Sequence, residues 1–138
     1  MKKILITFII AVVILSAVGC YALLNEMFPL AEPIKLPSDG DIISVTLMQK
    51  NDRSTRLEIP EYSDVMRYIS ECEPTRKWSI QDYPDAESYY TLEIESVGRL
   101  YRLFVYREGA KIYIESPYEG VYASDGVLFD ELGEYFAQ

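Results

Sequence analysis

The stretch YYTLEIESVGRLYRLFVYREGAKIYIES, residues 89–116, determines the fold class predicted for this chain. It contains two runs in which apolar and polar residues alternate, 89–95 and 112–115, and a mainly apolar run between them, 100–107. A period of two predicts strands that each bury one face. Glycine-containing turns around Gly98 and Gly109 separate the runs, so we expect the three strands to form an antiparallel meander.

Upstream of this meander the sequence predicts a hairpin, a helix and a short strand. Strands at 43–48 and 55–59 are joined by a turn at 50–53. Apolar residues spaced i, i+3, i+4 and i+7 predict an amphipathic helix over 62–69. Trp78 and Ile80 flank Ser79, which predicts a short strand at 78–80.

Downstream, residues 117–123 are expected to form a connection, with or without a brief strand at Val121, and Ser124 or Asp125 to cap a last helix. The apolar face of that helix comprises Leu128, Leu132, Tyr135 and Phe136. The predicted order is β-β-α-β-β-β-β-α. This order is typical of an α+β fold, with an antiparallel sheet of about five to six strands, two helices packed on it and a hydrophobic helix before it.

Composition divides the chain into three segments: a membrane anchor or lipoprotein signal segment at 1–24, a proline-containing spacer at 25–38 and an extracytoplasmic domain at 39–138. Prolines in the spacer disfavour helix and leave a semi-extended chain. We expect the spacer to lift the domain off the bilayer, and a disordered connector explains the prolines equally well.

The N-terminal segment has two interpretations. Lys2 and Lys3 precede an uncharged stretch, residues 4–24, and about 20 apolar residues are enough to cross a bilayer as an uncleaved helix. Alternatively, residues 17–19 resemble the lipobox of a lipoprotein signal peptide, which makes Cys20 a candidate for lipidation. In both cases the lysines stay in the cytoplasm, and we expect a cell-membrane protein with a single N-terminal anchor and an extracellular C-terminal domain.

The part after the anchor is strongly acidic. Without Lys2 and Lys3, 11 of the 13 basic residues remain against 22 acidic ones, a net charge of −11. A surface of this charge repels phosphate backbones and anionic lipid headgroups, so we expect neither a nucleic-acid partner nor membrane binding of the polybasic type. A protein or another envelope component is the partner class that remains, and solubility alone also explains the charge.

Catalytic and metal-binding signatures are missing from the sequence. There is no histidine, and the two cysteines do not have the spacing of a zinc site. Cys72 lies between Glu71 and Glu73, whose charges disfavour a reactive thiolate. We therefore expect no enzymatic activity, no metal and no cofactor, and a non-catalytic binding module as the function.

The alternative function is a cell-envelope hydrolase that uses paired carboxylates. Glu93 and Glu95 are two residues apart on one predicted strand and share its outward face, and Asp82 is a third candidate acid. Two carboxyl groups of this kind hydrolyse glycosidic bonds. The same spacing is also typical of the solvated face of a sheet.

Tyrosine is unusually frequent, with 12 in the chain. Four of them are predicted to face outward or to lie in the connection after residue 114: Tyr89, Tyr113, Tyr118 and Tyr122. Exposed aromatic side chains are suited to a binding surface. Cross-strand tyrosine pairs also stabilise an antiparallel sheet, so both roles remain open.

The run Tyr-Ile-Glu-Ser-Pro-Tyr-Glu-Gly-Val-Tyr, residues 113–122, resembles the signature Tyr-Ile-Glu-Gln-Pro-Tyr-x-Gly-Ile-Tyr. That signature belongs to a family of small secreted or membrane-anchored proteins from Gram-positive bacteria, catalogued only as a domain of unknown function. Residues 79–84 are similar to its Ser-x-x-Asp-x-Pro stretch and residues 36–37 to its Leu-Pro. Ser116 and Val121 replace the usual Gln and Ile.

The resemblance implies an N-terminal export or anchor signal and no assigned activity. The motif itself also suggests local structure. Pro117 is expected to end a strand and Gly120 to permit a turn. Tyr118 and Tyr122 are then expected to clamp this connection onto the sheet.

Overall fold

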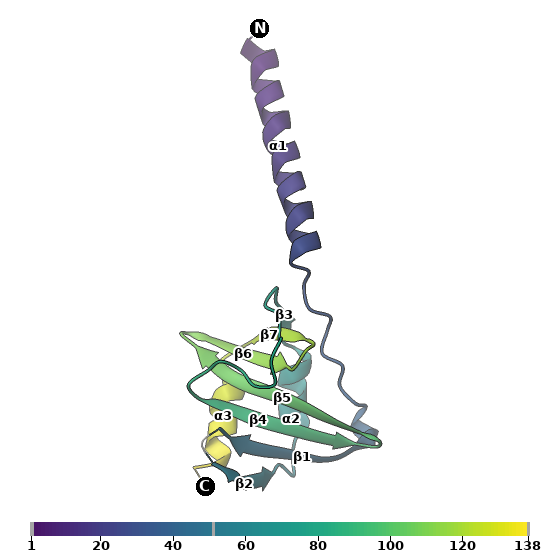
Figure 1. Ribbon diagram of the computed structural model, residues 1–138, viewed down its shortest axis with the longest axis vertical. Helices are drawn as coiled ribbons and strands as arrows, with labels where there is room; N and C mark the ends of the chain where they lie inside the picture. Colours follow the sequence, from purple (N-terminus) through teal and green to yellow (C-terminus); the bar gives the residue numbers. More distant parts are fainter. Residues whose placement is uncertain (1, 51, 138) are drawn as a thin grey trace. The chain divides into compact units, whose positions relative to one another are not determined.

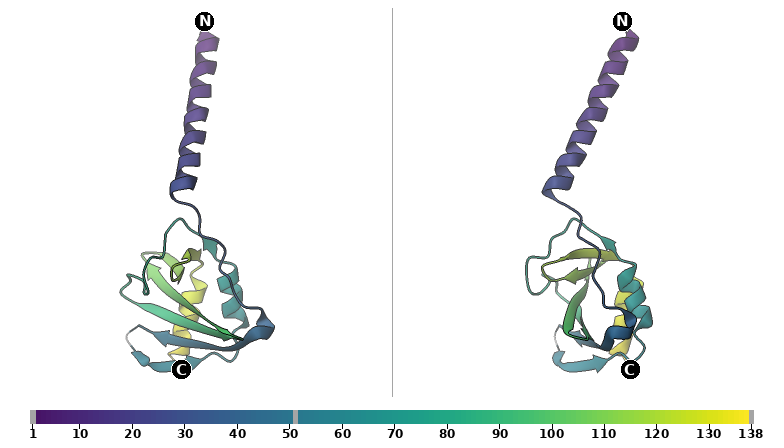
Figure 2. Two further views of the ribbon diagram at one scale, coloured as in Figure 1. Left: turned by 45° about the vertical axis from the view of Figure 1, so that its right-hand side comes forward. Right: turned by 90° about the vertical axis from the view of Figure 1, so that its right-hand side faces the viewer.

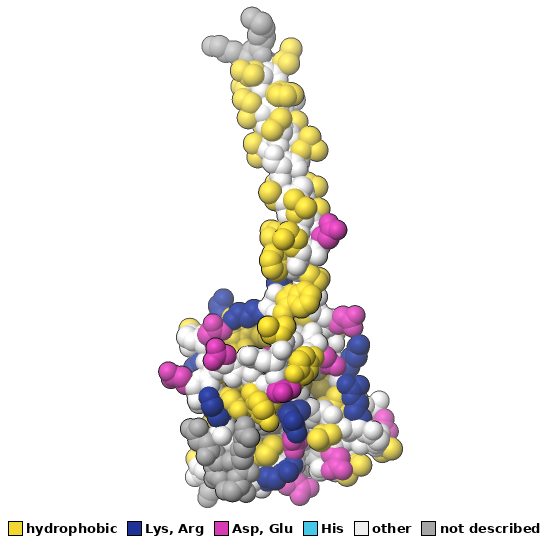
Figure 3. Space-filling model, viewed as in Figure 1, with side chains coloured by type: hydrophobic (Ala, Val, Ile, Leu, Met, Phe, Trp, Pro, Cys, Tyr) yellow, Lys and Arg dark blue, Asp and Glu magenta, His cyan; other side chains and the backbone are white. Residues whose placement is uncertain are grey.

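The computed structural model describes residues 2–50 and 52–137, in two compact units (Figure 1). The first unit ends at Leu30 and contains α1 (Lys2–Met27). Its span Lys3–Met27 is long and apolar enough to cross a membrane, by length and composition. Hydrophobic side chains cover the visible side of α1, with one acidic side chain near its C-terminal end (Figure 3). The predicted N-terminal hydrophobic helix is confirmed.

The second unit begins at Ala31 and is an α+β domain, as predicted. Its strands are β1 (Ile42–Gln49), β2 (Asp52–Glu58), β3 (Glu73–Pro74), β4 (Tyr89–Ser96), β5 (Arg99–Glu108), β6 (Lys111–Ser116) and β7 (Gly120–Ser124). Its helices are the 3-10 turn η1 (Asp39–Asp41), α2 (Ser63–Ser70) and α3 (Val127–Tyr135). All neighbouring strands are antiparallel, in the order β2-β1-β4-β5-β6-β7-β3. The described part of the sheet thus has seven strands rather than five to six.

The predicted meander of three strands is present as β4, β5 and β6, and β7 extends it by a fourth strand. Gly98 and Gly109 have positive φ angles of 82° and 63°, a backbone conformation that glycine adopts without steric cost. The hairpin of β1 and β2 is also present. Asn51, which belongs to its predicted turn, lies outside the described residues.

One predicted strand is wrong. Residues 78–80 form no strand and belong instead to a loop, residues 75–88, between β3 and β4. The short strand of this region is β3, which pairs with β7 through Glu73 and Pro74. The prediction assumed that the apolar residues on either side of Ser79 face the core. They point to solvent instead: Trp78 is 62% exposed and Ile80 76%.

Both α2 and α3 cover the same face of the sheet (Figure 2) and enclose the main core with it. From α2, Val65, Met66 and Ile69 are buried, which matches the predicted stripe of an amphipathic helix. From α3, Leu128 and Leu132 are fully buried. Central strand residues complete this core: Val45, Leu47, Leu92, Ile94, Leu103, Val105, Ile112 and Ile114.

The 75–88 loop covers part of the opposite face. Beneath it lies a second, mainly aromatic core: Tyr89, Phe104, Tyr106, Tyr113 and Val121. The ring of Tyr83 from the loop lies 5.6 Å from that of Phe104, and Tyr89 meets Phe104 edge to face at 5.4 Å. This loop therefore gives the sheet a third layer that the sequence pattern did not predict.

Residues 31–38 are part of the domain rather than a free spacer. The Ala31 N–H donates a hydrogen bond of 3.0 Å to the Thr75 carbonyl, and the Tyr122 hydroxyl donates one of 2.7 Å to the Glu32 carbonyl. Ile34 and Leu36 pack against the main core. The compact domain thus starts at Ala31 rather than at residue 39.

Candidate functional site

The two family-like segments, 79–84 and 113–122, meet in space although they are far apart in sequence. Ser79 is buried and its hydroxyl donates a hydrogen bond of 2.7 Å to Oε1 of Glu115 on β6. The same hydroxyl oxygen accepts a hydrogen bond of 3.2 Å from the Tyr118 N–H. One serine side chain thus holds the 75–88 loop both to the sheet and to the turn after β6.

The turn between β6 and β7, residues 117–119, carries an unusual backbone conformation. Tyr118 has a φ of 62°, a left-handed value that costs a non-glycine residue free energy. The Glu119 N–H closes the turn on the Ser116 carbonyl at 3.0 Å, and the Ser116 hydroxyl donates to Oε2 of Glu119 at 2.7 Å. These bonds hold the tyrosine in its strained position.

Gly120 serves close packing rather than turn flexibility. Its φ is not positive, so the predicted conformational role is wrong. A Cβ at this position would lie 2.5 Å from Cβ of Ala31 and 3.3 Å from the Tyr122 hydroxyl. Only a residue without a side chain lets the 31–38 segment cross here.

The four candidate tyrosines separate into three environments. Tyr89 and Tyr113 lie on the face opposite the helices but are buried beneath the 75–88 loop, and Tyr122 is buried in the main core. The expectation that these three are exposed is wrong, because that loop and the 31–38 segment cover them. Tyr118 alone of the four is exposed, at 65%. Burial raises the pKa of Tyr122 to about 12.

Tyr118 stands at the edge of a groove of about 470 Å³. The groove is bordered by cationic and aromatic side chains from four segments: Lys35, Tyr83, Arg99, Arg102 and Tyr118. Asp82 lies in its wall and accepts a hydrogen bond of 2.6 Å from the Tyr118 hydroxyl, which raises the pKa of this phenol. Arg99 approaches Glu119 at 3.5 Å and lies over the ring of Tyr101. Three cations and two carboxylates thus line the groove, and each cation pairs with a carboxylate: Lys35 with Glu32, Arg99 with Glu119 and Arg102 with Glu93.

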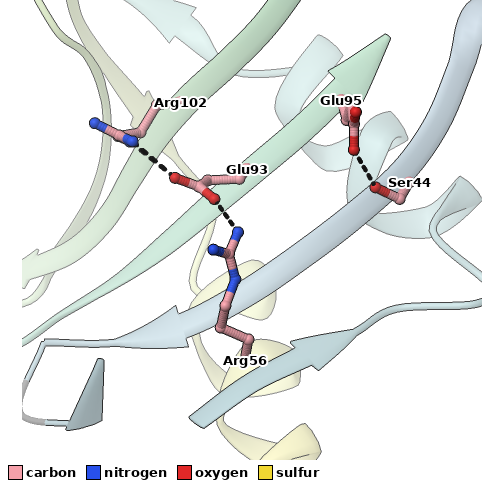
Figure 4. A network of polar contacts seen from close by, with 5 residues as sticks. All are labelled: Ser44, Arg56, Glu93, Glu95 and Arg102. Atoms are coloured by element: carbon pink, nitrogen blue, oxygen red, sulfur yellow. Dashed lines mark hydrogen bonds and ion pairs between the residues drawn. The ribbon is translucent and has the colours of Figure 1, made fainter. Parts of the chain in front are cut away.

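Glu93 is held between two guanidinium groups (Figure 4). Arg102 on β5 donates to its Oε1 through Nε at 3.1 Å and through Nη2 at 2.8 Å. Arg56 on β2 pairs with its other oxygen. The Glu93 side chain is only 9% exposed. Through its two arginine partners, this carboxylate on β4 joins β4 to β2 and to β5.

Sequence reasoning did not identify either arginine. Arg102 had a usable signal, because the tight turn at Gly98 places residue 102 opposite residue 93 in the β4–β5 register. Arg56 had none, since it reaches Glu93 from β2 across the intervening β1. Only the strand order brings it near.

The three carboxylates of the hydrolase alternative all have partners. Glu93 and Glu95 line one open pocket, and Asp82 lines the groove beside Tyr118. Glu93 is paired with arginines, Glu95 accepts a hydrogen bond of 3.3 Å from the Ser44 hydroxyl, and Asp82 accepts one from Tyr118. Within residues 2–50 and 52–137, no group of three or more Cys, Asp or Glu side chains is arranged to hold a metal ion.

The two cysteines lie in different compact units. Cys20 is an exposed residue of α1, and its lipidation stays a prediction. Cys72 follows α2 and is partly buried among core residues. Burial raises the pKa of its thiol to about 11, which keeps it protonated and unreactive at neutral pH.

Comparisons with known proteins identify relatives without an activity. The family model DUF5301, whose description reads domain of unknown function (DUF5300), matches residues 30–123. Among solved structures, the chain is similar to a protein from Ruminococcus gnavus determined by NMR, with 33% identity and a TM-score of 0.55. That alignment covers 65% of this chain and 89% of the other. No curated protein matches the chain.

Proposed function

Since this chain belongs to the DUF5301 family, whose description assigns no activity, we propose that it is a membrane-tethered extracytoplasmic domain that binds a protein or envelope component without catalysis. The binding surface in this proposal is the groove beside Tyr118. One observation carries it: an exposed aromatic side chain is held in a strained backbone conformation at the groove's edge.

Strain of this kind persists only where surrounding contacts enforce it, and it is concentrated at functional sites. Here the turn bonds, Ser79 and Asp82 all restrain Tyr118. A pre-ordered aromatic side chain loses little conformational entropy on binding. The three cations that line the groove already pair with carboxylates of the chain, so the exposed Tyr118 ring is the main contact that this surface offers to a partner.

The tether in this proposal is α1 as an uncleaved spanning helix. Its apolar length supports this role, and the lysines before it favour export of the domain. The competing lipidation of Cys20 predicts a different mature N-terminus. Mass spectrometry of the purified protein separates the two, because an intact Met1 or Lys2 terminus contradicts lipidation and an acylated Cys20 contradicts the spanning helix.

Site-specific crosslinking tests the binding surface. The photoreactive residue p-benzoylphenylalanine replaces Tyr118 in the full chain, and intact cells are irradiated. The matched control carries it in place of Glu134, which is exposed on α3 and does not line the groove. We expect a discrete adduct at position 118 and none at 134; equal or absent adducts at both positions contradict the proposed surface.

Protease treatment of protoplasts tests the topology. We expect added protease to digest the acidic domain while a cytoplasmic marker stays intact. A domain that survives while another exposed protein is degraded contradicts the proposed location.

A further inference from the structure

The chain is short between the end of α1 and the start of the domain. Helix α1 ends at Met27, and Ala31 is already hydrogen-bonded to Thr75 at 3.0 Å. Residues 28–30 alone connect the two points, and a fully extended chain of this length spans at most about 14 Å. If α1 crosses a membrane, connectivity therefore keeps Thr75 within about that distance of the helix end.

The 75–88 loop starts at this same point and is anchored firmly there. The Thr75 N–H and hydroxyl both donate to the Val121 carbonyl, at 3.0 Å and 2.6 Å, and the Lys77 N–H donates to the Thr75 hydroxyl oxygen at 3.1 Å. Ser79 is tied to Glu115. The backbone of residues 75–79 is thus held at both ends.

Two large apolar side chains project from this anchored segment. Because Ser79 points inward, its neighbours Trp78 and Ile80 are left in solvent, 62% and 76% exposed. Arg76 and Lys77 precede them in the sequence. The Lys77 ammonium pairs with Glu108 and lies 4.2 Å from the centre of the buried Tyr113 ring, so its charge already has a partner within the domain.

We propose that residues 76–80 dock on the interface of the bilayer in which α1 is anchored, with Trp78 and Ile80 inserted among the lipid headgroups. This inference rests on the membrane anchoring in the proposed function. Tryptophan prefers the membrane interface, and neighbouring basic side chains favour lipid phosphates. The acidic residues of the loop, Asp82, Asp85 and Glu87, lie in its second half and stay outside the contact.

Residues 28–30, which connect α1 to the domain, have the composition of an interfacial segment. Phe28 and Leu30 are apolar and exposed, and Glu26 is the only charged residue between Lys3 and Ala31. A chain of this kind is expected to stay at the bilayer surface rather than extend into water. Docking then orients the domain, because residues 28–30 and the 75–88 loop both hold it at the bilayer surface.

Fluorescence of the full chain provides the test, because Trp78 is the single tryptophan. The protein is reconstituted in vesicles of phosphatidylcholine and phosphatidylglycerol in equal parts, with brominated acyl chains as quenchers. We expect Trp78 emission to fall at least about twofold in brominated vesicles and acrylamide quenching to be weaker than in detergent. Emission unchanged by bromination would overturn the inference, including the case in which a second copy or a protein covers the loop.

A charged substitution distinguishes insertion of the loop into the lipid headgroups from simple nearness of the domain to the bilayer. Ile80→Asp should weaken bromolipid quenching about twofold or more, because it places a charge in the interface. Ile43→Asp, at a residue 61% exposed on β1, should leave the quenching unchanged. Equal quenching in I80D and the unaltered protein would overturn the inference, since anchoring by α1 alone would then explain why Trp78 lies near the lipid.

Flotation of the vesicles reports anchoring separately. A chain that does not float contradicts the proposed anchoring by α1, whereas a floating chain without quenching contradicts only the docking.

Discussion

The phenolic hydroxyl of Tyr118 donates a hydrogen bond to Oδ1 of Asp82, with 2.6 Å between the two oxygens. This contact connects the turn after β6 to the 75–88 loop across 36 positions of sequence. It also sets the direction of an exposed aromatic ring at the edge of the groove. The relation between the two side chains is therefore a direct probe of the candidate site.

Asp82→Asn should lower the pKa of Tyr118 towards the ordinary tyrosine value. A carboxylate that accepts a hydrogen bond favours the protonated phenol, so its replacement by a neutral amide removes the main cause of the raised pKa. Tyrosine Cζ chemical shifts followed by NMR across alkaline pH measure the effect. Tyr90 is the control, because burial is the main cause of its raised pKa. An unchanged Tyr118 pKa contradicts the observed bond.

Gly120→Ala should destabilise the domain by about 1–3 kcal/mol, the usual range for overpacking. Its Cβ would lie 2.5 Å from Cβ of Ala31, so the 31–38 segment would have to move. Gly126→Ala is the matched control: nothing lies within 4 Å of the added carbon, and its φ of −69° suits alanine. Urea unfolding followed by circular dichroism measures both, and equal stabilities of the two variants contradict the proposed packing.

Glu93 and Arg102 should show a coupling free energy of about 1 kcal/mol in a double-mutant cycle with alanine. The value is modest because the Arg102 side chain is 45% exposed and solvent screens the pair. Added salt should reduce it. The exposed pair Arg107 and Asp130, 3.0 Å apart, is the control and should couple more weakly. No coupling between Glu93 and Arg102 contradicts a stabilising role for this network.

Cys72 should make the domain less stable as the pH rises from about 9 to about 11. The pKa of its thiol is about 11 in the folded protein against 9.0 as its ordinary value, so the unfolded chain loses this proton first. The contribution of this raised pKa to the free energy of unfolding is fully present below pH 9. It is lost as the pH rises through the folded-state value of about 11. Urea midpoints measured in a Cys20→Ser background should therefore fall more steeply over this range than those of Cys72→Ala. Parallel curves contradict the raised pKa.

The meander was predictable from sequence because its determinants are local. Alternation at 89–95 and 112–115, the apolar run between them and the glycines at the two turns specify the strands and their antiparallel order without reference to any distant segment. The stripe of α2 and the apolar face of α3 are local signals in the same sense. The apolar N-terminal helix follows from composition alone.

The short strand β3 and the 75–88 loop were not predictable in this way. A two-residue strand carries no period, and Pro74 reads as a stop signal unless β7 is known to lie beside it. Around Ser79, an inward serine and outward Trp78 and Ile80 invert the usual pattern. The inversion follows from the hydrogen bond that Ser79 makes with Glu115 on a distant strand.

The sequence by itself determined an apolar N-terminal helix, an acidic α+β domain and the absence of histidine chemistry, because each depends on composition or on neighbours along the chain. Only the tertiary structure decided which tyrosines are exposed and where the domain begins. Two extended segments that lack any periodic signal, 31–38 and 75–88, cover Tyr122, Tyr89 and Tyr113 and leave Tyr118 in solvent. Their positions depend on single hydrogen bonds and close contacts between distant residues, which no local pattern encodes.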